Sequence, residues 1–141
     1  MARLLKVSEA ASLAMHAMVF LAGRPGRRVS TGDIAEALDV SEAHLSKVLQ
    51  RLAKAGLVRS VRGPSGGFTL GRPGGKIALL EVYEAIEGPL APLKCLFGRP
   101  VCAGEECILG DLLESVDKKA KARLAGTRLS QLSHVFAMTK G

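Results

Sequence analysis

Hydrophobic residues recur at three- and four-residue steps along most of the chain, the spacing that places them on one face of a helix. The first such segment, residues 10–22, is apolar almost throughout and predicts a buried helix that Ser8 caps and Gly23 ends. Similar periodicity predicts helices over residues 30–38, 41–56, 78–87 and 107–125, with a short helical piece over 129–136.

The second and third predicted helices are close together in the chain and have clear start signals. Ser30 with Asp33, and then Ser41, can satisfy the free amides of a helix N-terminus. The third helix carries basic residues, including Lys47 and Arg51, opposite its hydrophobic stripe. Two helices joined by a short turn, with a basic second helix, are typical of a helix-turn-helix.

The hydrophobic pattern changes period after the third helix. Residues 57–62 and 68–70 form two short β-like runs around a Gly- and Pro-rich turn, which predicts a hairpin. A hairpin directly after a helix-turn-helix is the wing of a winged helix, and its tip carries Arg62. We therefore expect a mainly α fold with a small β-hairpin wing. A winged helix-turn-helix domain would occupy residues 1–76, and a cysteine loop with dimerisation helices would occupy 77–141.

Charge is distributed unevenly along the 141 residues, of which 20 are Lys or Arg and 13 are Asp or Glu, for a formal net charge of +7. Residues 1–76 hold 12 basic and 5 acidic residues, whereas residues 77–141 hold 8 of each. A basic domain of this kind predicts a polyanionic partner, here double-stranded DNA. We expect contacts from Ser41, His44, Ser46, Lys47 and Arg51 in the major groove, and from Arg59 and Arg62 at the minor groove.

Several other classes of protein fit the sequence poorly. A hydrophobic content of 48% excludes a wholly disordered chain. The apolar run after Arg3 and Lys6 imitates a secretory signal, but it lacks a small-x-small cleavage site and is too short to span a bilayer, so we expect a cytoplasmic protein without membrane contact. Residues 63–67 match the G-x-S-x-G pattern of hydrolases, but a second strand follows where that motif needs a helix. We therefore expect no enzyme activity and no small-molecule substrate.

Three cysteines, Cys95, Cys102 and Cys107, fall within 13 residues of a Gly- and Pro-rich loop. An odd number of cysteines in one loop does not suit a disulfide framework, and in a reducing compartment the thiols stay available to a metal. Their wide spacing lacks the C-x2-C pair of structural zinc sites and suits an iron–sulfur cluster. The spacing alone leaves open a zinc site, a thiol switch and three unrelated cysteines.

The helix predicted after the cysteine loop is long and amphipathic. Its hydrophobic stripe consists of Leu109, Leu112, Leu113, Val116, Ala120 and Leu124. Only a short helical piece follows it in the chain and could cover that stripe. We therefore expect the helix to bury its stripe against a second subunit, forming a homodimer.

Residues 57–70, with the sequence LVRSVRGPSGGFTL, resemble the wing of the Rrf2 superfamily of bacterial winged-helix regulators almost residue for residue. The resemblance covers nearly the whole chain and implies a homodimer that binds a near-palindromic operator. Cys95, Cys102 and Cys107 lie where the iron–sulfur members, of the IscR and NsrR types, keep three cysteines before the dimerisation helix. This implies an iron–sulfur cluster, without deciding between two irons and four.

The resemblance also bears on a fourth cluster ligand. IscR-type members have a histidine three residues after the last cysteine, where this chain has Gly110. NsrR-type members take a carboxylate from the first helix of the partner subunit, and the corresponding residue here is Glu9, which we take as the fourth ligand. A carboxylate in the first turn of a helix is also common for structural reasons. His16 is a rival ligand on the same face, although we expect it to pack within the apolar helix.

These expectations combine into a transcriptional repressor whose operator affinity depends on the state of the cluster. Loss or modification of the cluster by nitric oxide, oxidation or iron shortage would release the cysteine loop and shift the spacing of the two recognition helices. The alternative is a metal-free winged-helix regulator whose cysteines respond directly to oxidants.

Overall fold

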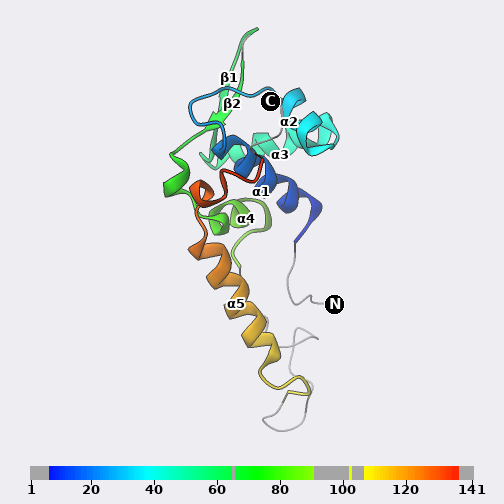
Figure 1. The fold of residues 1–141 in the computed structure, drawn as a ribbon. Coiled ribbons are helices and arrows are strands. Elements are labelled where there is room, and N and C mark those ends of the chain that lie inside the picture. Colours follow the sequence, from blue (N-terminus) through cyan, green and yellow to red (C-terminus); the bar gives the residue numbers. More distant parts are fainter. Residues whose placement is uncertain (1–6, 65, 91–101, 103–106, 137–141) are drawn as a thin grey trace.

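The computed structural model describes residues 7–64, 66–90, 102 and 107–136, and its secondary structure is mainly helical with one hairpin. In chain order the elements, with η for a 3₁₀ helix, are α1 (Glu9–Ala22), α2 (Thr31–Leu38), α3 (Glu42–Lys54), β1 (Val58–Val61), β2 (Gly67–Leu70), η1 (Gly74–Lys76), α4 (Leu79–Glu87), α5 (Leu112–Gly126) and η2 (Leu129–Leu132). The hairpin projects from one end of the helical body and α5 from the other (Figure 1). This architecture confirms the predicted fold class.

Serine caps begin the first three helices, as the sequence predicts. The Oγ atoms of Ser8, Ser30 and Ser41 each accept a hydrogen bond from the backbone N–H three residues later, at 3.0 to 3.2 Å. Asp39 ends α2 in the left-handed conformation, with φ of 55°. Because Ser41 starts α3 only two residues later, the turn of the helix-turn-helix is tight.

The hydrophobic core is built around α1, which is buried along most of its length. Helices α3 and α4 and the η2 turn all pack against it. Phe20 of α1, Leu49 of α3 and Leu129 of η2 are fully buried in one cluster. The core therefore continues across the boundary predicted between residues 76 and 77, and the division of the chain at that point stays a prediction.

The segment that follows α5 returns to the helical body and completes the core. The Leu129 N–H donates to the Ile77 carbonyl at 3.0 Å. Near the end of the segment, Arg24 Nη2 donates to the Phe136 carbonyl at 3.2 Å, and the Arg24 guanidinium lies 3.7 Å from the centroid of the Phe20 ring. Residues 127–136 are thus held on α1 by apolar contacts and by the Arg24–Phe136 hydrogen bond, while backbone hydrogen bonds join them to the chain just before α4.

Helix α5 starts later than its hydrophobic pattern predicts, at Leu112 rather than at residue 107. Gly110 has a φ of 63°, in the left-handed region, and its N–H closes a turn on the Cys107 carbonyl at 2.9 Å. This turn separates the cysteine from the helix. No described helix is both long and apolar enough to cross a membrane.

His16 is exposed, so the expectation that it packs within the apolar helix is wrong. Its Nδ1 lies 2.7 Å from the Ser12 carbonyl oxygen one turn earlier. Its ring meets the Phe136 ring edge-on, with the centroids 6.4 Å apart. The position lies on the surface of α1 because the opposite side of the helix faces the core.

Candidate functional site

Helix α3 presents the predicted DNA-reading residues at different depths. Ser41 and Lys47 are exposed, whereas His44 and Ser46 are half-buried. Since Ser41 Oγ already accepts the His44 N–H at 3.2 Å, its own hydroxyl proton remains free to donate outward. The opposite side of α3 is fully buried, which fixes which side faces outward.

Arg51 makes a contact that the sequence does not suggest. Its Nη2 donates to the carbonyl of Ile86, in the last turn of α4, at 2.7 Å. A cation at a helix C-terminus is favourable because the free carbonyls there carry partial negative charge. Arg51 therefore ties α3 to α4, and its remaining donors are left for the DNA contact that we predict.

Glu9 and His44 lie next to each other, although the sequence gives them separate roles. Glu9 Oε1 lies 3.8 Å from His44 Nδ1, and the Glu9 side chain is 81% exposed. The two form an ion pair only when the histidine is protonated. The structure thus places the expected cluster ligand of α1 beside an expected DNA-contacting residue of α3.

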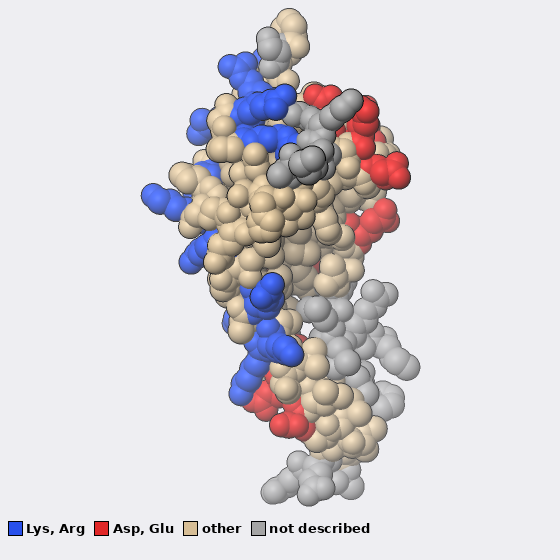
Figure 2. Space-filling model, in the orientation of Figure 1, with Lys and Arg blue, Asp and Glu red and all other residues tan. Residues whose placement is uncertain are grey.

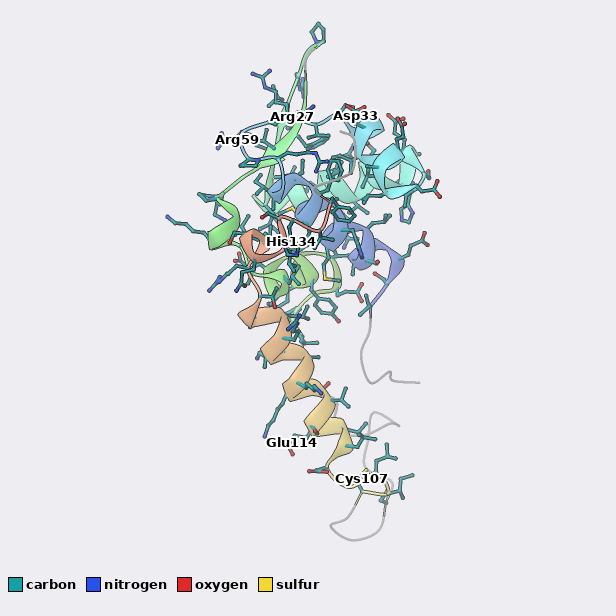
Figure 3. The ribbon with its side chains drawn as sticks, in the orientation of Figure 1. Arg27, Asp33, Arg59, Cys107, Glu114 and His134 are labelled. Carbon is teal, nitrogen blue, oxygen red and sulfur yellow. The ribbon has the colours of Figure 1, made fainter. Side chains whose placement is uncertain are left out.

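The wing is a short antiparallel hairpin in which Arg59 of β1 pairs with Thr69 of β2. Arg59 and Arg62 are both exposed, as their predicted role requires. In Figure 3 the labels of Arg59 and of Arg27, from the segment before α2, are both on the part of the hairpin next to the helical body.

Val29 adds a third strand position to the wing, which sequence reasoning missed. Its N–H and carbonyl pair with those of Phe68, at 3.0 and 2.8 Å. Gly67 makes this approach possible, because a Cβ at that position would lie 2.6 Å from the Val29 oxygen. Val29 stands alone between two arginines and a serine, so the sequence shows no alternating hydrophobic pattern here that would predict a strand.

Positive and negative charges are segregated on the surface around the wing and α3. Between His44 and Leu80 the sequence has seven basic residues and no acidic residue. The acidic residues of this region precede them, at exposed positions of α2 and the α3 start: Asp33, Glu36, Asp39 and Glu42. In the upper part of Figure 2 the Lys and Arg side chains gather at the wing and along one side of the body, while Asp and Glu lie on the other; lower down, over α5, both kinds lie together. A polyanion would therefore approach from the wing side of α3.

A second electrostatic contact holds the base of the wing to α4. The Arg72 guanidinium donates a hydrogen bond to the Glu81 carboxylate, and the pair is partly exposed. Burial alone would raise the pKa of Glu81, but the hydrogen bond and charge of Arg72, with the N–H of Ala78, hold it below its ordinary value. This pair links the chain after β2 to the start of α4.

The two described cysteines, Cys102 and Cys107, are free thiols, and Cys107 lies near the outer end of α5 (Figure 3). Cys102 is exposed and Cys107 is half-buried. The Leu109 N–H donates to Cys107 Sγ at 3.4 Å, a bond of the kind that tunes cluster sulfur ligands. Cys95 lies outside the described residues, within which no three His, Cys, Asp or Glu side chains gather around a common point.

The donor types present fit an iron–sulfur cluster, since thiols bind iron and Glu9 offers an exposed carboxylate. Within one chain, however, Cys107 lies at the far end of α5, while α1 starts on the body (Figures 1 and 3). Glu9 and Cys107 of the same chain are therefore not brought together, and a shared site needs two subunits.

The chain matches a family of known proteins over residues 7–134, described as "Rrf2: Iron-dependent Transcriptional regulator". It is 34% identical over 105 residues to the HTH-type transcriptional regulator IscR of Xenorhabdus nematophila, an alignment that covers 74% of this chain and 63% of that protein.

Two solved structures are similar over almost the whole fold. The structure of CymR (YrzC), the global cysteine regulator of B. subtilis, has a TM-score of 0.80 and 30% identity, and covers 93% of this chain and 98% of that one. T. potens IscR has a TM-score of 0.72 and 31% identity, and covers 93% of this chain and 88% of that one. The similar proteins thus include an IscR and a cysteine regulator.

Proposed function

Because the chain belongs to the Rrf2 family of transcriptional regulators, we propose that it binds a near-palindromic DNA operator as a homodimeric repressor and that an iron–sulfur cluster sets its affinity. The observation that carries the DNA-binding part is the winged helix in which the stretch between His44 and Leu80, covering most of α3 and the wing, has seven basic residues and no acidic residue. The family match supports the same conclusion independently.

DNA recognition divides between α3 and the wing. Ser41, His44, Ser46 and Lys47 read base edges in the major groove, where hydroxyl, imidazole and ammonium groups can discriminate bases. Arg59 and Arg62 contact the backbone and the minor groove beside them. Arg51 supports the docking of α3 through its bond to α4 and contacts DNA with its remaining donors.

The dimer places the two recognition helices at the spacing of two half-sites, about one helical turn apart. Exposed apolar residues in the turn before α5 and at its first position support this dimer, since Ile108 is 83% exposed and Leu112 is 45% exposed in the single chain. When a second subunit covers large exposed apolar side chains, the removal of their surface from water favours the dimer.

Cys95, Cys102 and Cys107 of one subunit, with Glu9 of the other, would hold the cluster, which when bound supplies a redox-active centre that reacts with nitric oxide and oxidants. Glu9 is the residue that connects this site to DNA reading. In the single chain Glu9 lies 3.8 Å from His44, so a movement of the Glu9 carboxylate toward a cluster would break this contact. The position of Glu9 thus couples the cysteine loop of one subunit to α3 of the other.

Anaerobic purification with iron and acid-labile sulfide assays tests the cofactor. We expect a coloured protein that contains both elements, and a loss of most of the iron in Cys107→Ser. Glu9→Gln should change the absorption spectrum and the stability of the bound iron, while the control Glu36→Gln, also an exposed helix carboxylate, should leave both unchanged. Iron-free, colourless protein after anaerobic reconstitution would overturn the cluster part of the proposal.

A thiol switch without metal is the second candidate. The similarity to the global cysteine regulator of B. subtilis supports it, as do the free thiols of Cys102 and Cys107. If this candidate holds, the iron-free protein changes its DNA affinity on treatment with hydrogen peroxide or cystine, and a thiol reductant restores the affinity. Replacing Cys102 or Cys107 with Ser would remove that response.

A further inference from the structure

The segment between α1 and α2 carries three arginines, Arg24, Arg27 and Arg28, and none of them belongs to the DNA-reading set. Gly26, with φ of 75°, turns the chain here, and the Arg27 N–H donates to the Arg24 carbonyl at 3.1 Å. Two residues further, Val29 is fixed to the wing by its paired hydrogen bonds with Phe68. Arg27 and Arg28 are therefore held between a turn and a strand position, although they lie in a connecting segment.

The strand register places Arg28 beside the wing arginines. Val29 pairs with Phe68 in antiparallel fashion, so the residue before Val29 shares a row with Thr69. Thr69 in turn pairs with Arg59. Residues of one row point to the same side of a sheet, so Arg28 and Arg59 share the side opposite buried Val29.

Arg27 and Arg28 are the exposed arginines of this segment. Within the described part of the chain, neither Arg27 nor Arg28 forms a salt bridge, and both are exposed. The pKa of Arg24 is lowered first by burial and then by the charge of Arg27, so these two cations lie close enough to repel each other. The nearby acidic residues lie on α2, which Figure 2 shows on the other side of the body.

We propose that Arg27 and Arg28 form a third DNA contact, in which they bind backbone phosphates beside the wing. This inference rests on the proposed DNA-binding function and extends its interface. The backbones of Arg28 and Arg59 are two strand spacings apart, or about 10 Å. Because arginine side chains are long, this separation lets the two residues reach phosphates on opposite sides of a minor groove about 6 Å wide. The segment inserts no helix or strand into a groove, so it contributes to DNA affinity through phosphate contacts and not to the recognition of base sequence.

The test measures how DNA affinity depends on salt for the double variant Arg27→Gln/Arg28→Gln. The probe is a fluorescent duplex of about 30 base pairs with arbitrary sequence, because phosphate contacts persist in non-specific complexes. We expect weaker binding and a shallower plot of log affinity against log salt, by about 0.9 for each phosphate that the variant no longer neutralises. The matched control Lys119→Gln/Lys121→Gln removes two exposed charges from α5, at the opposite end of the molecule.

The proposal requires the control to keep the wild-type slope. An unchanged slope in the arginine variant, or an equal change in the control, would overturn it. Circular dichroism and thermal unfolding check that the arginine variant is folded. If the wild-type protein itself fails to bind duplex DNA at low salt, the proposed function fails instead, which is a different result from normal wild-type binding with an unaffected variant.

Discussion

Replacing Leu129 with Ala tests whether the segment after α5 is part of the DNA-binding body. Leu129 has no exposed surface, and its N–H is bonded to the Ile77 carbonyl. The change removes three buried carbons, worth about 2.4 kcal/mol at roughly 0.8 kcal/mol each. The cavity left behind raises the expected loss in the free energy of unfolding to about 3–4 kcal/mol.

Urea unfolding, followed by circular dichroism at equal protein concentrations, measures this loss. Val135→Ala is the matched control, because Val135 belongs to the same segment but is 52% exposed, and we expect a change within about 0.5 kcal/mol there. A Leu129→Ala loss below about 1 kcal/mol, with an unchanged denaturant slope, would contradict the description of residues 127–136 as a buried part of the core.

Three further predictions concern other contacts of the fold. Ser8→Ala should cost about 1–2 kcal/mol in urea unfolding, because it removes the cap of α1 and the hydrogen bond to Glu87. The second carboxylate oxygen of Glu87 is already buried without a partner among the described residues. A neutral result refutes the role of the cap. Gly67→Ala should speed hydrogen exchange at the Val29 and Phe68 amides and weaken DNA binding. The control Gly75→Ala should do neither, because its Cβ would lie 3.6 Å from Ser130 Oγ, an ordinary van der Waals distance. Because the folded-state pKa of Glu81 lies below its unfolded value, its pairing stabilises the fold above the ordinary carboxyl pKa and this contribution disappears as pH falls through the folded pKa. Arg72→Ala should raise the pKa of Glu81 in an NMR titration and reduce the acid-range dependence of stability, and an unmoved pKa would count against the pair.

Local signals in the sequence account for most of the helices and for the wing. The serine caps, the glycines at turns and the helical periodicity act within a few residues, so Ser8, Ser30 and Ser41 could be identified without a structure. The predicted start of α5 is too early for a local reason as well. Gly110 adopts a left-handed conformation, which the spacing of hydrophobic residues does not indicate.

Contacts between residues distant in the sequence could not be predicted in the same way. The bond from Arg51 to Ile86, the pairing of Val29 with Phe68 and the burial of Leu129 depend on how the helices pack. The exposure of His16 also depends on packing, because α1 is apolar almost throughout and its sequence does not show which side faces solvent.

The candidate site was predictable only as a set of residue types. The basic surface of α3 and the wing follows from the sequence, because charge segregation is visible in the order of residues. The contact between Glu9 and His44 is not visible there, since it joins two helices. The cluster ligands remain a prediction, because Cys95 lies outside the described residues and the expected site is shared between subunits.

The most direct test of the central claim is the affinity of the protein for operator DNA in two states, with anaerobically bound cluster and after the iron is removed by chelation. Fluorescence anisotropy at fixed salt measures both, on an operator selected from random duplexes by the protein itself. The proposed mechanism predicts that the two affinities differ by tenfold or more, about 1.4 kcal/mol, with both states folded and dimeric. Equal affinities in the two states would contradict it.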